Sequence, residues 1–83
     1  MKVTVKYFAS IREGLGLGHE LLTTSATTLG ALRDELIGRG DAYAENLARG
    51  KTLRMAINQV MGDDACALTE GAEVAFFPPV TGG

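Results

Sequence analysis

The chain begins MKVTVKYF, a sequence in which polar and apolar residues alternate. A period of two is typical of a β-strand with one buried face, so we predict a strand over residues 2–8. The alternation fails at Phe8, an apolar residue on the polar side of this strand. After one expected helical turn over residues 9–13, the glycine-rich segment 14–18 predicts a flexible turn. This turn leads into a second strand over residues 19–24 and makes an N-terminal hairpin.

Apolar residues then recur at intervals of three and four, which gives one apolar stripe along a helix. The residues of this stripe are Leu29, Leu32, Leu36 and Ile37. The pattern predicts a helix over residues 29–37, which starts after N-cap candidates among residues 25–28 and ends at Gly38. Residues 33–35, Arg-Asp-Glu, are expected to face water. Residues 41–48 are expected to hold one more short helical turn.

The C-terminal part of the chain contains three further strand patterns. Leu53, Met55 and Ile57 alternate with more polar neighbours, which predicts a strand over residues 53–58. Asn58-Gln59 is expected to turn the chain into a short fourth strand at residues 60–61. A last strand is predicted over residues 73–77.

The predicted order is therefore two strands, a helix and three strands, with about five short strands and one main helix. One helix can cover only one face of such a sheet. The arrangement indicates an α+β protein with a mixed sheet of the β-grasp type, whose first and last strands lie parallel at the centre. We predict a β-grasp domain over residues 1–78 and an extended, flexible tail over residues 79–83.

Composition excludes several classes of function. The 83 residues carry a net charge of −2 with scattered Lys and Arg, which argues against nucleic-acid binding. No apolar run approaches the roughly 20 residues of a membrane span. No signal peptide is recognisable, and a single cysteine excludes an internal disulfide and a cysteine-based zinc site. We expect a cytoplasmic protein.

The last eight residues read FFPPVTGG. Pro78 and Pro79 cannot continue a central sheet ladder, and they hold the following residues extended. Gly82 and Gly83 lack a Cβ atom, so their backbone can enter a channel too narrow for other residues. Such a tail presents the α-carboxylate of Gly83 to a partner.

Two aromatic residues are expected on the face of the sheet that the helix leaves open. Val74 and Phe76 fall on one face of the last strand, and Phe77 falls on the other. If the helix covers the apolar side of the first strand, Phe8 also points to the open side. Exposed apolar patches of this kind usually mark a partner site. The alternative is that loops fold over the two rings and form a second small core.

The remaining reactive side chains do not form a convincing catalytic constellation. Asp63 and Asp64 stand close to Cys66 and disfavour its thiolate, so a passive thiol is expected. These two carboxylates are expected to be solvated in a turn. His19 has no second His or Cys at a metal-binding spacing, so we predict no metal site. Any chemistry is therefore expected at Gly83 or on a partner.

Several segments together resemble the small subunit of molybdopterin synthase, the ubiquitin-like sulfur carrier of molybdenum cofactor biosynthesis. These segments are residues 5–13 (VKYFASIRE), 29–36, 57–59 (INQ) and 68–83 (LTEGAEVAFFPPVTGG). The resemblance runs nearly end to end, and its most specific part is the C-terminal FFPPVTGG. It implies a ubiquitin-like β-grasp fold and a non-catalytic, sulfur-donating subunit that binds no cofactor itself.

The resemblance also implies a reaction and its partners. A ubiquitin-activating-like adenylyltransferase uses ATP to adenylate Gly83, and a persulfide sulfur donor converts the adenylate into a thiocarboxylate. The large synthase subunit, in a heterotetramer, then receives this sulfur for cyclic pyranopterin monophosphate. Phe8, Met61 and Phe77 are the implied docking residues. The implied threading residues are Pro79, Val80, Thr81 and Gly82.

Three other functions stay open on the sequence. The chain could carry sulfur for another pathway, as in thiamine synthesis, although carriers of that kind are typically shorter and lack the FFPP stretch. It could be a protein modifier that forms an isopeptide bond through Gly83. It could also be a plain interaction domain, in which case deletion of Gly82 and Gly83 would leave its activity intact.

Overall fold

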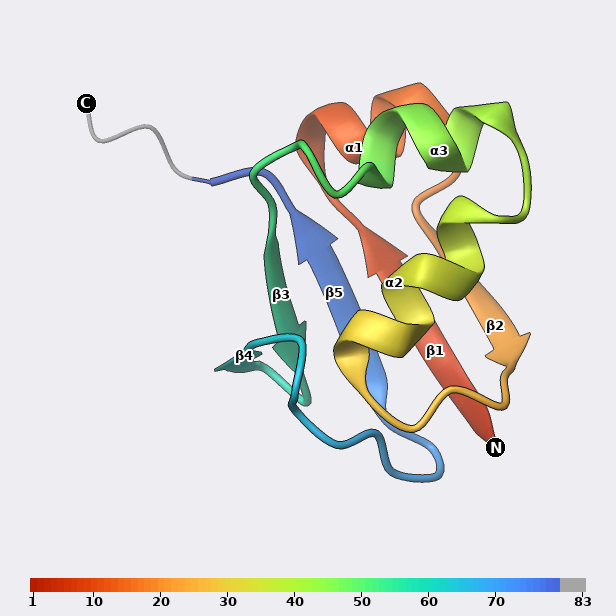
Figure 1. Ribbon diagram of the computed structural model, residues 1–83, viewed down its shortest axis with the longest axis vertical. Coiled ribbons are helices and arrows are strands. Elements are labelled where there is room, and N and C mark those ends of the chain that lie inside the picture. The colour runs from red at the N-terminus through yellow and green to blue at the C-terminus, as the bar shows by residue number, and fades with distance from the viewer. Residues whose placement is uncertain (80–83) are drawn as a thin grey trace.

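The computed structural model describes residues 1–79 of the chain (Figure 1). In chain order, the elements are β1 (Lys2–Tyr7), α1 (Ala9–Leu15), β2 (His19–Thr23), α2 (Leu29–Ile37), α3 (Asp41–Leu47), β3 (Arg54–Ile57), β4 (Val60–Gly62) and β5 (Glu73–Phe77). All five predicted strands are present, and their ends differ from the predicted ends by at most one residue.

The strands form one mixed sheet in the order β2-β1-β5-β3-β4. β1 and β5 are parallel neighbours, whereas the other three pairs of neighbouring strands are antiparallel. Figure 1 shows α2 lying across one face of the sheet, with α1 and α3 at the end where β1 and β5 finish. The predicted α+β fold, with the first and last strands parallel in the middle of the sheet, is confirmed.

The prediction of one main helix underestimated the helical content, because α1 and α3 are complete helices of seven residues each. Each of them buries an apolar side chain, Ile11 in α1 and Leu47 in α3. The glycine-rich turn starts later than predicted, since α1 continues to Leu15 and ends at Gly16 with φ 75°. None of the helices in residues 1–79 is long and apolar enough to cross a membrane.

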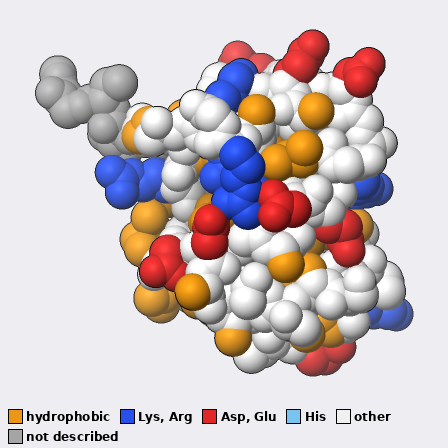
Figure 2. All heavy atoms as spheres, in the orientation of Figure 1, with side chains coloured by type: hydrophobic (Ala, Val, Ile, Leu, Met, Phe, Trp, Pro, Cys, Tyr) orange, Lys and Arg blue, Asp and Glu red, His pale blue; other side chains and the backbone are white. Residues whose placement is uncertain are grey.

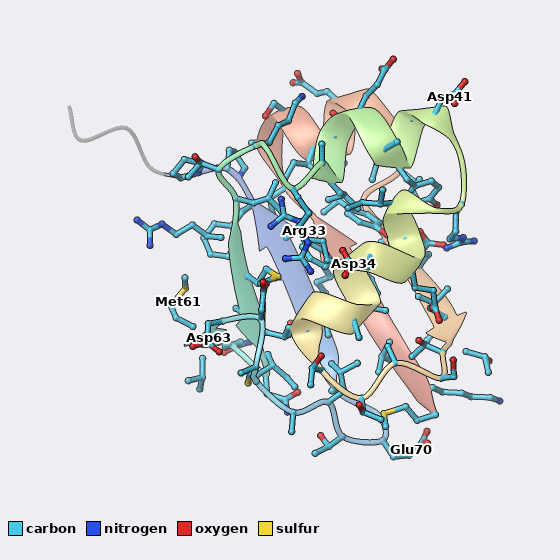
Figure 3. The ribbon with its side chains drawn as sticks, viewed as in Figure 1. Arg33, Asp34, Asp41, Met61, Asp63 and Glu70 are labelled. Carbon is cyan, nitrogen blue, oxygen red and sulfur yellow. The ribbon has the colours of Figure 1, made fainter. Side chains whose placement is uncertain are left out.

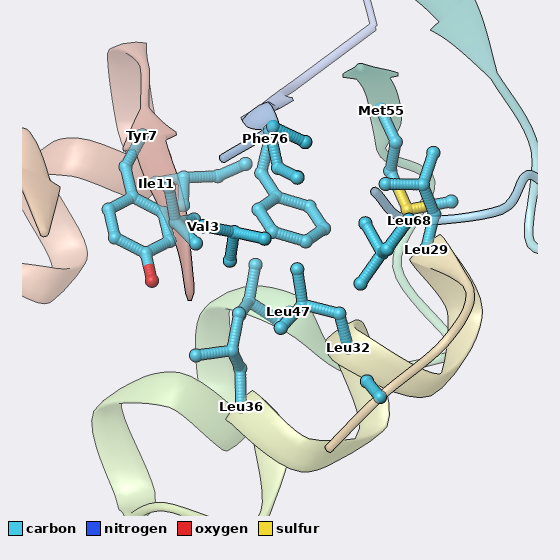
Figure 4. Close-up of a cluster of buried hydrophobic side chains, with 14 residues drawn as sticks. Val3, Tyr7, Ile11, Leu29, Leu32, Leu36, Leu47, Met55, Leu68 and Phe76 are labelled. Atoms are coloured by element: carbon cyan, nitrogen blue, oxygen red, sulfur yellow. The ribbon is translucent and has the colours of Figure 1, made fainter. Parts of the chain in front are cut away.

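The core lies between the sheet and α2, and Figure 4 shows its side chains. Its largest fully buried members come from β1, β5, α2 and α3: Val3, Val5, Tyr7, Val74, Phe76, Leu29, Leu32, Leu36 and Leu47. The rings of Tyr7 and Phe76 stack with centroids 6.2 Å apart and planes 14° apart. These two residues are opposite one another in the parallel pairing of β1 and β5, which fixes the register of the central strands.

The turn between β3 and β4 is the two-residue hairpin loop predicted at Asn58 and Gln59. Both residues have positive φ, 49° and 69°, which suits the right-handed twist of the flanking strands. Asn58 Oδ1 also accepts a hydrogen bond from the Glu73 backbone N–H at 3.0 Å. This bond ties the tip of the hairpin to the start of β5.

Arg33 was expected to face water but is buried, with only 6% of its surface exposed. Its guanidinium donates hydrogen bonds to the carbonyl oxygens of Leu47, Ala48 and Lys51. These carbonyls belong to the last residue of α3 and to the segment after it, where Ala48 leaves the helical conformation and no glycine closes the helix. Burial lowers the pKa of Arg33, but the three acceptors stabilise its charged form.

Glu20 joins three elements through one carboxylate. It accepts hydrogen bonds from the hydroxyls of Tyr7 and Tyr43, both at 2.8 Å, and from the Arg39 guanidinium at 2.9 Å. Burial alone would raise the pKa of Glu20, but the bonds from Tyr43, Tyr7 and Arg39 outweigh burial and hold this pKa below its ordinary value. The carboxylate therefore favours the folded state when it is ionised.

This cluster predicts an acid-sensitive contribution to stability. Because the folded pKa of Glu20 lies below the ordinary value of 4.5, the contribution is fully present above that pH and is lost as pH falls through the folded pKa. Glu20→Ala should lower the free energy of unfolding at neutral pH by about 1–3 kcal/mol, since two tyrosine hydroxyls lose their acceptor. Urea titrations across the acidic range measure both effects.

The control for this prediction is Glu35→Ala, which removes a carboxylate that is half-buried like Glu20 but for which the structure gives no hydrogen-bond partner in residues 1–79. This variant should keep the stability of the parent and its acid dependence. A Glu20→Ala protein whose stability falls with acid as steeply as that of the parent would contradict the assignment.

Candidate functional site

The open face of the sheet carries the aromatic pair that the sequence predicted. Phe8 is 46% exposed, and Phe77 is half-buried. Their ring centroids are 6.5 Å apart with the planes at 86°, an edge-to-face contact. The prediction that both rings share the face opposite Val74 and Phe76 is confirmed. Because the described residues leave Phe8 so exposed, the alternative of a second core covered by loops is wrong for this ring.

The position of Phe8 follows from its backbone. Its N–H donates to the Phe76 carbonyl at 3.2 Å, so the pairing of β1 with β5 continues one residue beyond β1. Its own carbonyl accepts from the N–H groups of Ile11 and Arg12 in the first turn of α1. The residue that joins the central strand to α1 is therefore held on both sides, and its ring projects from a rigid backbone.

Met61 is the third residue of this face, and together Phe8, Met61 and Phe77 are named the apolar patch. Met61 lies on β4, at the edge of the sheet (Figure 3), and is 55% exposed. In the sheet register it is opposite Ala56, which is in turn opposite Ala75 on β5. Two alanines, buried Ala56 and half-buried Ala75, thus separate Met61 from the centre of the sheet.

Charged side chains surround the apolar patch. Lys6 and Glu73, from the neighbouring strands β1 and β5, form an ion pair with 3.4 Å between Nζ and Oε2. Arg54 is exposed and is opposite Phe77 in the pairing of β3 with β5. Figure 2 shows the opposite, helix-covered face of the molecule, where basic and acidic side chains are also interspersed without a large area of one sign. This distribution does not favour nucleic acid as a partner.

A shallow hollow of about 460 Å³ lies beside the patch, between β3 and the loop that follows β4. Arg54, Met61 and the loop residues Asp63 and Asp64 line it, and Cys66 lines an adjoining part. Cys66 is half-buried against the core, as predicted for a passive thiol.

Asp64 was expected to be merely solvated, but it forms an ion pair with Arg49 at 2.6 Å. Arg49 also binds Asp34 at 2.8 Å and donates to the Gly30 carbonyl, so it fastens the loop after β4 to α2. The bond to Asp34 is the main reason why the pKa of Arg49 is raised above its ordinary value. The wall of the hollow is thereby fixed, although no sequence pattern indicated this contact.

Within residues 1–79, no group of three His, Cys, Asp or Glu side chains lies close enough to hold a metal ion. His19 is exposed on β2, opposite Lys6 on β1, and thus has a cation as its neighbour in the sheet.

Most of the predicted tail residues lie outside the part of the chain that the structure describes. Pro79 is the last described residue and is half-buried. The predicted reacting residue Gly83 and the predicted threading residues Val80, Thr81 and Gly82 lie outside the described residues. The structure therefore places the patch and the start of the tail together at the end of β5, and the predicted roles of the last four residues stay predictions.

Sequence reasoning did not single out Arg54 as a site residue. The alternation over residues 53–58 puts Arg54 on the same side as Ala56, but only the pairing of β3 with β5 brings it beside Phe77. A prediction of the strand order together with the register would have found it.

The mixed sheet, its helical layer and the open apolar patch define a ubiquitin-like protein of the β-grasp fold. The profile of the ThiS family matches residues 5–83. The chain belongs to the ThiS family.

Three known proteins show how close the similarity is. The molybdopterin synthase sulfur carrier subunit of Haemophilus influenzae is 42% identical over 81 residues, which cover 98% of this chain and 99% of the relative. The crystal structure of SAMP1 from Haloferax volcanii matches with a TM-score of 0.79 and 25% identity, over 100% of both chains. A protein–protein complex of subunits 1 and 2 of the molybdopterin-converting factor from Helicobacter pylori contains a chain that matches with a TM-score of 0.70 and 27% identity, again over 100% of both chains. The predicted resemblance to the small subunit of molybdopterin synthase is confirmed.

Proposed function

We propose that this chain is the sulfur-carrying subunit of a molybdopterin synthase and that its reacting group is the carboxylate of Gly83. The observation that carries the proposal is the position of the apolar patch at the end of β5, from which the sequence runs through two prolines to a Gly-Gly terminus. The full-length similarity to the Haemophilus influenzae sulfur carrier subunit supports it.

The proposed chemistry starts with activation of the terminal carboxylate. A carboxylate is a poor electrophile because its charge is delocalised and its leaving group is oxide. A ubiquitin-activating-like adenylyltransferase joins a carboxylate oxygen of Gly83 to the α-phosphorus of ATP and releases pyrophosphate. The product is a mixed anhydride whose leaving group is AMP.

Sulfur then replaces AMP. The terminal sulfur of a persulfide donor bonds to the acyl carbon of Gly83, and AMP departs. A thiol cleaves the resulting acyl disulfide, so that the Gly83 thiocarboxylate is released and the donor is left oxidised. In the large synthase subunit this thiocarboxylate donates sulfur to cyclic pyranopterin monophosphate, and two such transfers complete the dithiolene of molybdopterin.

In this proposal the domain positions the tail and is not an enzyme alone. Phe8, Met61 and Phe77 dock onto the large subunit, and Pro79 to Gly82 thread toward its active site. The large subunit supplies the acid–base groups and the substrate pocket. The chain binds no cofactor itself, because ATP is used by the activating enzyme.

We place the protein in the cytoplasm. The Helicobacter pylori complex of subunits 1 and 2 supports a large-subunit partner, and the heterotetramer remains part of the proposal.

The test is the intact mass of the full chain after incubation with ATP, the activating enzyme and a sulfur donor. We expect a gain that matches the exchange of one oxygen for one sulfur at Gly83. The matched control is a chain that lacks only Gly83, which should show no gain. Addition of the large subunit and cyclic pyranopterin monophosphate should then reverse the gain in the complete chain.

Two results would speak against the proposal. An unchanged mass in the presence of a matching, active adenylyltransferase would contradict the carrier chemistry. A gain that persists with the large subunit and its substrate would exclude the molybdopterin pathway and favour a carrier for another pathway. Higher-mass conjugates on a denaturing gel would identify a protein modifier that acts through Gly83.

A further inference from the structure

Arg54 borders the apolar patch beside Phe77. It is directly opposite Phe77 in the antiparallel pairing of β3 with β5, and the Cβ atoms of such pairs are about 5 Å apart on the same face of a sheet. It also lines the hollow beside Met61. Arg54 therefore lies next to Phe77 and lines the same hollow as Met61, at the point where β5 ends.

The charge of Arg54 has no counter-ion within residues 1–79. The structure gives it neither an ion pair nor a side-chain hydrogen bond there. Three other arginines are engaged: Arg33 binds backbone carbonyls, Arg39 pairs with Glu20, and Arg49 pairs with Asp34 and Asp64.

No carboxylate of residues 1–79 pairs with Arg54. Glu73, on the same face, pairs with Lys6. Asp63 lines the same hollow, and its Oδ1 accepts the Ala65 N–H at 3.0 Å, but no ion pair joins its carboxylate to Arg54. Nothing described on this face therefore neutralises Arg54, in a chain whose net charge is −2.

We propose that the large subunit carries an acidic side chain that binds the Arg54 guanidinium when the apolar patch docks. This inference rests on the proposed function and specifies the chemistry of the docking surface. Any partner that covers Phe77 also removes water from the neighbouring guanidinium. A buried charge without a partner is strongly unfavourable, so the covering surface has to supply an acceptor. A carboxylate matches the planar, forked donors of arginine with two parallel hydrogen bonds.

The contact between Arg54 and the carboxylate also fixes the orientation in which the two subunits dock. The apolar contacts of Phe8, Met61 and Phe77 are non-directional, and three of them tolerate small rotations of the partner. A two-bond contact at Arg54 fixes the orientation of the sheet at the place where the tail leaves it. A small rotation there would misdirect the residues that follow, so Arg54 acts as a positioning residue for the tail.

The experiment measures the affinity of the folded full chain for the purified large subunit of the same organism by surface plasmon resonance. Arg54→Glu should weaken binding at least about tenfold, mainly through faster dissociation, because it sets two carboxylates against each other in a buried contact. Arg54→Ala should also weaken binding, whereas Arg54→Lys should retain part of the affinity. The melting temperatures of all three should stay near that of the parent, since Arg54 is exposed.

Lys2→Glu is the matched control. Lys2 is an exposed cation of β1, on the same face as Lys6 but at the far end of the strand from Phe8. The substitution changes the net charge by the same amount, so it reports the long-range effect of charge alone and should alter affinity by less than about threefold.

The outcomes separate this inference from the proposed function. If the parent chain binds the large subunit and Arg54→Glu binds within twofold of it, or no worse than Lys2→Glu, the acidic contact is overturned while the docking surface stands. If the parent chain itself does not bind, the proposed function fails first. An Asp or Glu of the large subunit whose change to Arg restores binding of Arg54→Glu would identify the partner group.

Discussion

Deletion of Gly82 and Gly83 is expected to abolish sulfur transfer completely and to leave the domain folded. The reacting carboxylate would then belong to Thr81, two residues short, and an extended chain spans only about 3.5 Å per residue. Thr81 also carries a branched side chain, which a channel shaped for glycine excludes. The described core ends with Phe76, so the free energy of unfolding should change by less than about 0.5 kcal/mol.

Two measurements on the same samples check this prediction. Molybdopterin formation in the reconstituted system should fall to the background of the large subunit alone, and the urea midpoint should match that of the parent. A chain extended by one glycine after Gly83 is the matched control for length, and it should lose transfer as well, since its carboxylate lies one residue too far. Retained transfer in the truncated chain would instead indicate a plain interaction domain.

The strands were predictable because each of them is encoded by its own residues. Alternation over residues 2–7 and 73–77 reports which side chains are buried, and the structure buries the predicted sides of both strands. The leucine spacing over residues 29–37 likewise determined α2 with its bounds. Where one face of an element packs against the core, the period of its apolar residues is sufficient to predict the element.

The short helices α1 and α3 were predicted only as single helical turns, for a related reason. Each has seven residues and buries only one side chain fully, which is too little for a helical period to emerge. Tertiary contacts stabilise them instead, since isolated helices of this length are unstable in water. The glycines at 14 and 16 also favoured a turn, yet Gly14 lies within α1, and only Gly16 uses the left-handed conformation.

The contacts of the charged residues could not be predicted from the sequence. Arg33 is part of a run of three charged residues, a pattern that usually denotes a solvated helix face, but its guanidinium binds carbonyls at and after the C-terminal end of α3 and is buried. Asp64 and Arg49 are 15 residues apart, and no local signal joins them. The same holds for the site: the sequence identified Phe8 and Phe77, whereas Arg54 became a candidate only through the register of β3 and β5.

Phe76 and Phe77 allow the clearest separation of folding from binding, because adjacent residues of β5 point to opposite faces of the sheet. Phe76 is fully buried and stacks on Tyr7, whereas Phe77 is half-buried beside the exposed ring of Phe8. Phe76→Ala removes a large side chain from the centre of the core and leaves a cavity. It should lower the free energy of unfolding by about 3–5 kcal/mol. For a small domain with a total stability of about 5–15 kcal/mol, that loss is enough to unfold a large fraction of the chains near body temperature.

Phe77→Ala should behave in the opposite way. Its ring touches the core less, so the cost in stability should be about 1 kcal/mol, the usual size for a residue outside a core. Its affinity for the large subunit should fall by about 2 kcal/mol or more, since aromatic anchors at the centre of an interface carry much of the binding energy. Urea denaturation and calorimetric titration of both variants measure the two quantities independently. If Phe77→Ala binds like the parent, the apolar patch is not the docking surface, and if Phe76→Ala is as stable as the parent, the packing in β5 is assigned to the wrong face.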